Sequence, residues 1–172
     1  MTSQAGRSIS IALVGGVAAM VYLTLGLLFW AGMIAWAACI EAGGDSDAVR
    51  KTIASSTFGA IMAWASLTVA LMVPVSPEGW AWVPRAAITV AVTLLVVGLG
   101  TRVAMLSRLT AALYGYAAVY AAYFIVVAEL SGLDRLTSPH LYNPVIAVVI
   151  AMVGGAVCAP VTNKLTAALS KG

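Results

Sequence analysis

Long apolar stretches separated by short polar segments run along almost the whole chain. Four stretches, at about 51–73, 84–101, 106–129 and 142–164, have the roughly 20 residues that an α-helix needs to cross the hydrocarbon core of a bilayer. Backbone N–H and C=O groups in lipid must be paired within their own segment, so Ala- and Val-rich stretches of this kind should be helices. The pattern predicts an all-α integral membrane protein with one transmembrane domain.

The first apolar stretch, Ile9–Ile40, contains no charged residue and has an unusual length. It is too long for one ordinary span and short for two. Two helices at about 9–25 and 27–42, turning near Gly26, would give the chain six spans, whereas one long helix would give five.

The distribution of basic residues decides between these topologies, because Lys and Arg concentrate in cytoplasmic loops. With six spans, seven basic residues lie on the side of both chain ends and two on the other side; with five spans, the division is three against six. In the six-span arrangement the seven are Arg7, Arg50, Lys51, Arg102, Arg108, Lys164 and Lys171, and the two are Arg85 and Arg135. The sequence therefore predicts six transmembrane helices with both termini in the cytoplasm.

The turn between the first two predicted helices contains no charged residue and no Pro, Asn or Asp, which leaves Gly26 as the expected break. One interpretation is a pair of shortened helices that meet below the outer surface, since irregular backbone at membrane depth must be covered by protein or line a wet cavity. The other is an ordinary tight turn at the interface.

The two halves of the chain show a weak internal similarity. Trp30–Gly32 is similar to Leu113–Gly115, and an acidic residue follows each segment near the end of its helix, Glu41 and Glu129. With six spans the second half would run in the opposite direction to the first, as in the 3+3 inverted repeats of many transporters. A duplication of this kind and its absence are both compatible with the sequence.

Small residues recur at every fourth position in two of the predicted spans. This spacing lets helix backbones approach each other closely in lipid. The stripes fit a compact bundle within one chain and equally fit subunit contacts in a homo-oligomer. They consist of Ser55, Gly59 and Ala63, and of Ala147, Ala151, Gly155 and Ala159.

The composition supports the membrane prediction and excludes other classes. Hydrophobic residues make up 62% of the chain and charged residues 9%, with a mean hydropathy of +1.02. Soluble domains carry roughly 25% charged residues, and disordered chains are poor in apolar ones. The net charge of +3 is spread along the chain, so no nucleic-acid partner is predicted.

Ionisable side chains within the membrane usually mark function, and the predicted spans carry none near their centres. Glu41 and Glu129 close two spans, where each could guard a pore mouth or simply be solvated. His140 is the only histidine and has no neighbouring Cys, Asp or Glu in the sequence with which to bind a metal or activate a nucleophile. No catalytic residue, metal or cofactor is predicted, and the protein is not expected to be an enzyme.

Hydroxyl and aromatic side chains are the remaining candidates for chemistry. Neutral hydroxyls beside aromatic walls suit the passage of a small uncharged polar solute, because they offer hydrogen bonds without a charge barrier. The same groups also join helices. The residues predicted to face a central cavity are Trp36, Ser55, Ser56, Tyr116 and Tyr120.

The segments Leu25–Leu28 and Trp30–Gly32 resemble the opening of a family of small bacterial inner-membrane proteins, domain of unknown function 1097. The similarity continues through Ala54–Ser56 and Gly59–Trp64 and covers about residues 20–66. It implies a bacterial plasma-membrane protein of about six spans and carries over no substrate or catalytic residues.

A channel or facilitator for a small neutral solute is the leading functional hypothesis. A non-transporting assembly or partner subunit is the alternative, since the small-residue stripes fit it equally well. The expected partners are the lipid bilayer, the solute and further copies of the chain.

Overall fold

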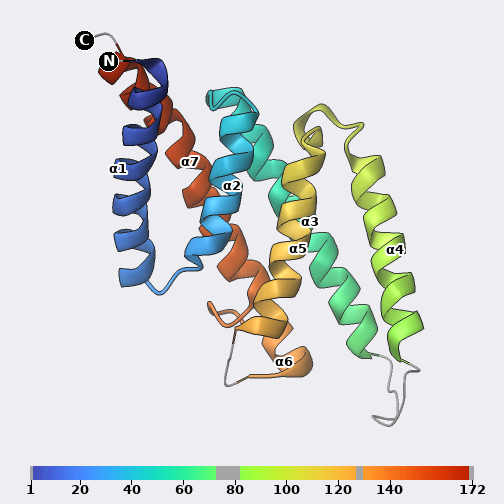
Figure 1. The fold of residues 1–172 in the computed structure, drawn as a ribbon. Coiled ribbons are helices and arrows are strands. Elements are labelled where there is room, and N and C mark those ends of the chain that lie inside the picture. The colour runs from blue at the N-terminus through green and yellow to red at the C-terminus, as the bar shows by residue number, and fades with distance from the viewer. Residues whose placement is uncertain (1, 73–81, 127–129, 171–172) are drawn as a thin grey trace.

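A computed structural model of the protein describes residues 2–72, 82–126 and 130–170 (Figure 1). Within these ranges the chain forms α-helices and one 3-10 turn, and no strand, which confirms the predicted all-α class. The helices are α1 (Ser3–Thr24), α2 (Phe29–Glu41), α3 (Ser46–Met72), α4 (Trp82–Gly100), α5 (Leu109–Ile125), α6 (Gly132–Thr137) and α7 (Pro144–Ser170), and the 3-10 turn is η1 (Ala104–Leu106).

Four of these helices, α1, α3, α4 and α7, are long and apolar enough to cross a membrane. The other two predicted spans are shorter apolar helices, because α2 has 13 residues and α5 has 17. At a rise of 1.5 Å per residue α2 covers about 20 Å, less than the roughly 30 Å of a bilayer's hydrocarbon core. The structure therefore supports four full-length spans and two short apolar helices.

Helices α1, α3 and α7 each extend at one end beyond the apolar stretch that predicted them. Helix α3 begins at Ser46 rather than near 51, because the Asp45 carboxylate accepts a 2.7 Å hydrogen bond from the backbone N–H of Ala48. An ion pair of 2.7 Å between Lys51 and Asp47 supports the same turn. Hydropathy registers only the part of a helix that lies in lipid, so it misses capped polar turns of this kind.

The first apolar stretch breaks at the predicted place. Helix α1 ends at Thr24 and Gly26 has a φ of +65°, a left-handed conformation that glycine adopts readily. Only one of the two helices is shortened, since α1 has 22 residues. In Figure 1 the turn that follows α1 lies higher than α6, closer to the level of the helix midpoints.

Two sets of three helices run in opposite directions. In Figure 1, α1 and α3 descend from the end where both chain termini lie and α2 ascends, whereas α4 and α7 ascend and α5 descends. The most extensive contacts join α3 to α5 and α7 to α2, followed by those of α1 with α7 and α4 with α3. Exchanging α1 with α4, α2 with α5 and α3 with α7 reproduces the same set of contacts.

Glycines bring the paired helices into backbone contact. A Cβ atom on Gly59 of α3 would overlap the carbonyl of Ala112 in α5, and one on Gly115 would overlap the carbonyl of Ser56. In the other pair, a Cβ atom on Gly155 of α7 would overlap the carbonyl of Gly32 in α2. The small-residue stripes of α3 and α7 are therefore used for packing inside the chain.

The connection from α5 to α7 is folded over the lower end of the bundle. Leu136 of α6 is buried, and its carbonyl accepts hydrogen bonds from the Trp64 indole at 2.9 Å and the Asn143 amide at 2.8 Å. The Asn143 side chain also accepts a bond from the backbone N–H of Val145 and so caps α7. The sequence analysis had assigned no structure to this connection.

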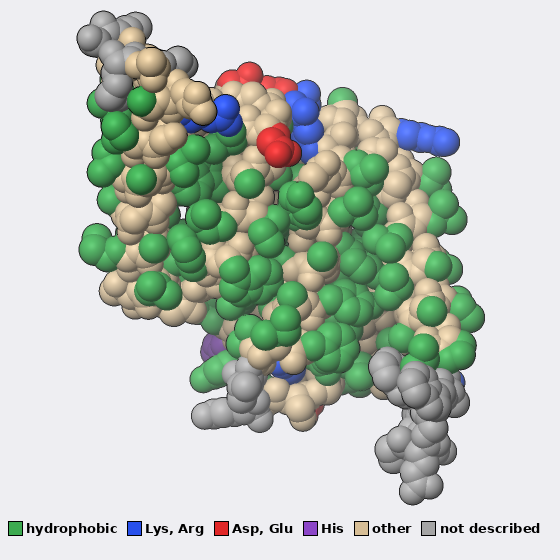
Figure 2. Space-filling view, viewed as in Figure 1, with side chains coloured by type: hydrophobic (Ala, Val, Ile, Leu, Met, Phe, Trp, Pro, Cys, Tyr) green, Lys and Arg blue, Asp and Glu red, His purple; other side chains and the backbone are tan. Residues whose placement is uncertain are grey.

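The first helix of each set, α1 or α4, exposes large apolar side chains on its outer face. Met20 and Leu23 on α1 and Ile88 and Leu95 on α4 are each more than 60% exposed. Figure 2 shows hydrophobic side chains over these surfaces, and most of the visible acidic and basic ones at the end that carries the chain termini. This distribution is the one that a surrounding bilayer requires.

Candidate functional site

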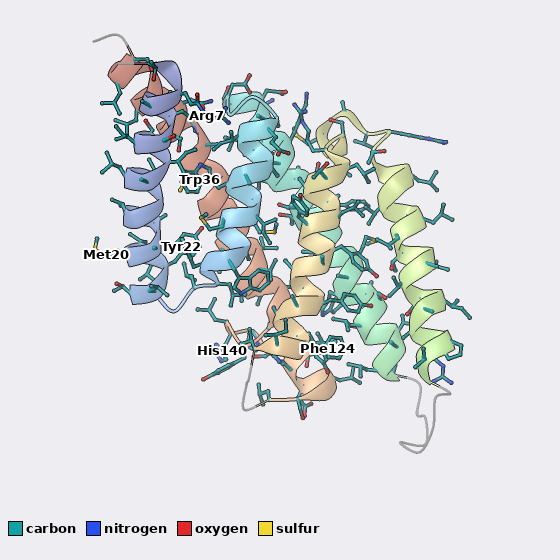
Figure 3. The ribbon with its side chains drawn as sticks, viewed as in Figure 1. Arg7, Met20, Tyr22, Trp36, Phe124 and His140 are labelled. Atoms are coloured by element: carbon teal, nitrogen blue, oxygen red, sulfur yellow. The ribbon has the colours of Figure 1, made fainter. Side chains whose placement is uncertain are left out.

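The predicted site residues do not converge on one cavity. Trp36 is 3% exposed and lies between α1 and α2 together with Tyr22 (Figure 3). Both side chains line a void of only about 10 Å³ beside α7. The indole Nε1 of Trp36 is buried and has no hydrogen-bond partner in the part of the chain that the structure describes. Trp36 thus belongs to the packing among α1, α2 and α7, away from the tyrosines of α5.

The two serines lie where α3 contacts α5. The Ser55 hydroxyl accepts a 3.3 Å hydrogen bond from the backbone N–H of Arg108, just before α5 begins. The Ser56 hydroxyl donates to the carbonyl of Ile53 in its own helix at 3.2 Å. Both side chains are buried, and only Ser55 reaches a neighbouring element.

The two tyrosines do meet, and they connect three helices. The rings of Tyr116 and Tyr120 stack with centroids 5.3 Å apart. The Tyr116 hydroxyl lies 2.8 Å from the Thr93 hydroxyl of α4, and the Tyr120 hydroxyl lies 2.7 Å from the Ser66 hydroxyl of α3. Ser66 also donates to the Thr89 hydroxyl at 3.4 Å. These five residues are called the hydroxyl cluster below.

The sequence analysis identified the tyrosines of this cluster but missed their partners. Thr89 and Thr93 are four residues apart, so they share one face of a helix. That spacing is the sequence signal that indicates a pair of hydroxyls on one side of α4. Ser66 carried no comparable signal, because its role depends on how α3 crosses α5.

Glu41 lies at a polar pocket of about 390 Å³, where α2 ends and α5 begins. This α2–α5 pocket is on the end of the bundle that carries both chain termini. It is lined by Ala38, Glu41, Ala42, Ser107, Arg108, Leu109, Thr110 and Ala111. Glu129, the second predicted mouth residue, lies outside the described residues.

Arg108 and Glu41 bring opposite charges to the α2–α5 pocket without pairing. One terminal nitrogen of Arg108 donates to the carbonyl of Ala42 at 3.4 Å, whereas its Nε is buried without a partner in the described ranges. Among the residues that the structure describes, the exposed Glu41 carboxylate has no hydrogen bond or ion pair. The sequence analysis used Arg108 only as a topology signal.

Arg135 is the other basic residue whose position was unexpected. It is 6% exposed, and its guanidinium donates to the carbonyls of Tyr142, Tyr123 and Ala122 at 3.1, 2.8 and 3.0 Å. Its charge also lies 5.5 Å from the centre of the Tyr123 ring. Arg135 therefore binds the carbonyl end of α5, where a positive charge is favourable.

Other kinds of site find no support in the described ranges. No group of three or more His, Cys, Asp and Glu side chains gathers there. His140 lies at the lower end of the bundle (Figure 3), with its backbone N–H donating to Ser138 at 3.3 Å.

The apolar helices and their exposed apolar surface indicate an integral membrane protein of the helical class. The model of the family described as "Protein of unknown function (DUF1097)" matches residues 8–167, and the chain belongs to this family. The match extends the similarity noted for residues 20–66 to most of the chain. No curated protein and no solved structure matches it.

Proposed function

We propose that the protein is a channel or facilitator for a small uncharged polar solute in the bacterial plasma (inner) membrane. The observation that carries this proposal is the position of the two short helices. Helices α2 and α5 are the second helices of two oppositely directed sets of three. Short apolar helices in corresponding positions of an inverted repeat are the strongest sequence-level pointer to a transport site.

The proposed topology is a 3+3 inverted repeat of six membrane-spanning helices with both termini in the cytoplasm. The reciprocal helix contacts and the matching glycines, Gly32 with Gly115 and Gly59 with Gly155, support the repeat. The excess of basic residues at the end that carries the termini supports the orientation.

The available chemistry fits a neutral solute. The centres of the described apolar helices carry no acidic or basic side chain, whereas hydroxyls are present at that depth in the hydroxyl cluster. We propose that Trp36, Ser55, Ser56, Tyr116 and Tyr120 contact the solute when a pathway opens, with Glu41 and Glu129 at its mouths. No enzymatic role or cofactor is proposed. Further copies of the chain are proposed partners in a homo-oligomer.

Solute flux into proteoliposomes tests the proposal. The purified protein should pass urea, acetamide, glycerol or ammonia faster than protein-free liposomes do. Thr110→Trp should lower the flux by filling the α2–α5 pocket, whereas Leu113→Trp, on an exposed position of the same helix, should not. Equal rates with and without folded protein, for all four solutes, would overturn the proposal.

A non-transporting assembly or partner subunit is the second candidate. It is favoured by the closed packing of the bundle, in which the cluster hydroxyls bond to each other and glycines hold the helices in backbone contact. Folded protein that passes none of the four solutes would favour this function.

A further inference from the structure

We infer that the α2–α5 pocket binds small neutral solutes that carry an amide group, with the carbonyl oxygen at Arg108 and the N–H groups at Glu41. The inference rests on the proposed function, for which it names the solute class and a binding residue. Figure 2 shows acidic and basic side chains close together at this end of the bundle.

Arg108 supplies the donors of the site. Its side chain is partly buried at the pocket, its Nε has no acceptor among the described residues, and the one bond that the side chain donates to them, to Ala42, is long at 3.4 Å. A buried N–H group without an acceptor is costly. Protein atoms cover Nε itself, so a ligand carbonyl oxygen in the pocket would accept from the terminal guanidinium nitrogens, whose bond to Ala42 is long.

Glu41 supplies the acceptors. Its carboxylate lines the same pocket and has no donor among the described residues. It lies at the last residue of α2, where the helix dipole already concentrates negative charge. N–H groups of a ligand would relieve this unfavourable position, because they bring partial positive charge to it.

The two helix ends separate charge across the pocket in the same direction as Glu41 and Arg108 do. The carboxyl end of α2 is the negative pole of that helix, and the amino end of α5 is the positive pole of the other. No side chain caps the first turn of α5, so its backbone N–H groups add to the positive side. A molecule with a carbonyl at one end and N–H groups at the other matches this field.

Charge excludes ions of a single sign as ligands. A carboxylate such as acetate would meet Glu41, and an ammonium ion would meet Arg108. A zwitterion could satisfy both side chains, but the apolar helices offer no charged partner beyond the pocket. Urea and short amides carry the required dipole without a net or separated charge.

Binding of acetamide to the purified full chain in detergent micelles, measured by saturation-transfer NMR, tests the inference. Acetamide should give a saturable signal, acetate and glycerol should bind at least about tenfold more weakly, and glycine should bind no more tightly than acetamide. Glu41→Ala should weaken acetamide binding by about tenfold, as expected for loss of a charge-assisted hydrogen bond. The fold should be kept, since the Glu41 side chain is exposed. Asp134→Ala, an exposed acidic position on α6, is the matched control and should not change binding.

The outcomes separate this inference from the proposed function. Glu41-dependent binding of acetamide supports the inference even where proteoliposomes show no flux. Flux without Glu41-dependent binding overturns the inference and leaves the transport proposal standing. Preferential binding of glycine or acetate overturns the amide class, and so does an equal loss of binding in Asp134→Ala.

Discussion

The hydroxyl of Tyr120 in α5 lies 2.7 Å from the hydroxyl of Ser66 in α3, so one hydrogen bond joins the two helices of the described chain that pack most extensively, one from each set of three. Neither atom belongs to the α2–α5 pocket. The pair can therefore be altered without touching that pocket.

Replacing Tyr120 with Phe removes this hydrogen bond and keeps the ring. We expect the free energy of unfolding to fall by about 0.6 kcal/mol, the average for interhelical hydrogen bonds in membranes. If the hydroxyl also contacts the solute, flux or selectivity in proteoliposomes should change. Tyr114→Phe is the control, because Tyr114 is 39% exposed on the same helix. Unchanged flux with a lower melting temperature would restrict Tyr120 to helix packing.

Replacing Gly59 with Ala places a methyl group against the carbonyl of Ala112. Because backbone atoms cannot move aside as a flexible side chain can, we expect a loss of about 3 kcal/mol, the upper end of the usual cost of overpacking. Thermal unfolding in detergent measures it.

Gly98→Ala on α4 is the matched control for this change. No atom lies within 4 Å of the added Cβ, so the better helix propensity of Ala should raise stability slightly. Equal melting temperatures for the Gly59 and Gly98 variants would contradict the close crossing of α3 and α5.

Replacing Arg135 with Leu removes three hydrogen bonds to backbone carbonyls and leaves those of Ala122 and Tyr123 without this donor. We expect the free energy of unfolding to fall by about 3 kcal/mol, since hydrogen bonds from a charged donor contribute more than those between neutral groups. Arg102→Leu, an exposed change, should shift stability by less than about 0.5 kcal/mol. Chemical denaturation of both variants gives the comparison, and a similar small effect at both positions would show that Arg135 is not needed to hold α5.

Cysteine labelling tests the orientation in the membrane. On a background without Cys39 and Cys158, cysteines at Asp47 and Arg102 should react only from the cytoplasmic side. A cysteine at His140 should react only from the outside. His140 is a better reporter of that side than Ser138, because Ser138 is buried. Labelling of Asp47 from the outside would invert or refute the predicted topology.

Hydropathy and turn chemistry were sufficient to predict much of the fold. The break at Gly26 followed from the absence of any other turn residue, and the helical class followed from the backbone's needs in lipid. The lengths of α2 and α5 did not follow, because the ends of a helix depend on caps and tertiary contacts that hydropathy does not register. Arg135 shows the same limit, since a basic residue in a loop gives no sign that carbonyls will enclose it.

The site was less predictable than the fold. The periodicity of Tyr116 and Tyr120 correctly placed them on one face of a helix, but the identity of their partners depended on which helix packs there. The charges of Arg108 and Glu41 lie far apart in sequence, and only the meeting of two short helix ends brings them to one pocket.

The glycine crossings also restrict how this protein can move. Because α3 is locked to α5, and α7 to α2, by direct backbone contact, each pair should behave as a rigid body. Any opening of the bundle must then occur at the seam between the two pairs, where α2 faces α5 and α3 crosses α7. The α2–α5 pocket lies on that seam, so a change in the angle between the rigid pairs would widen or close it without breaking either crossing.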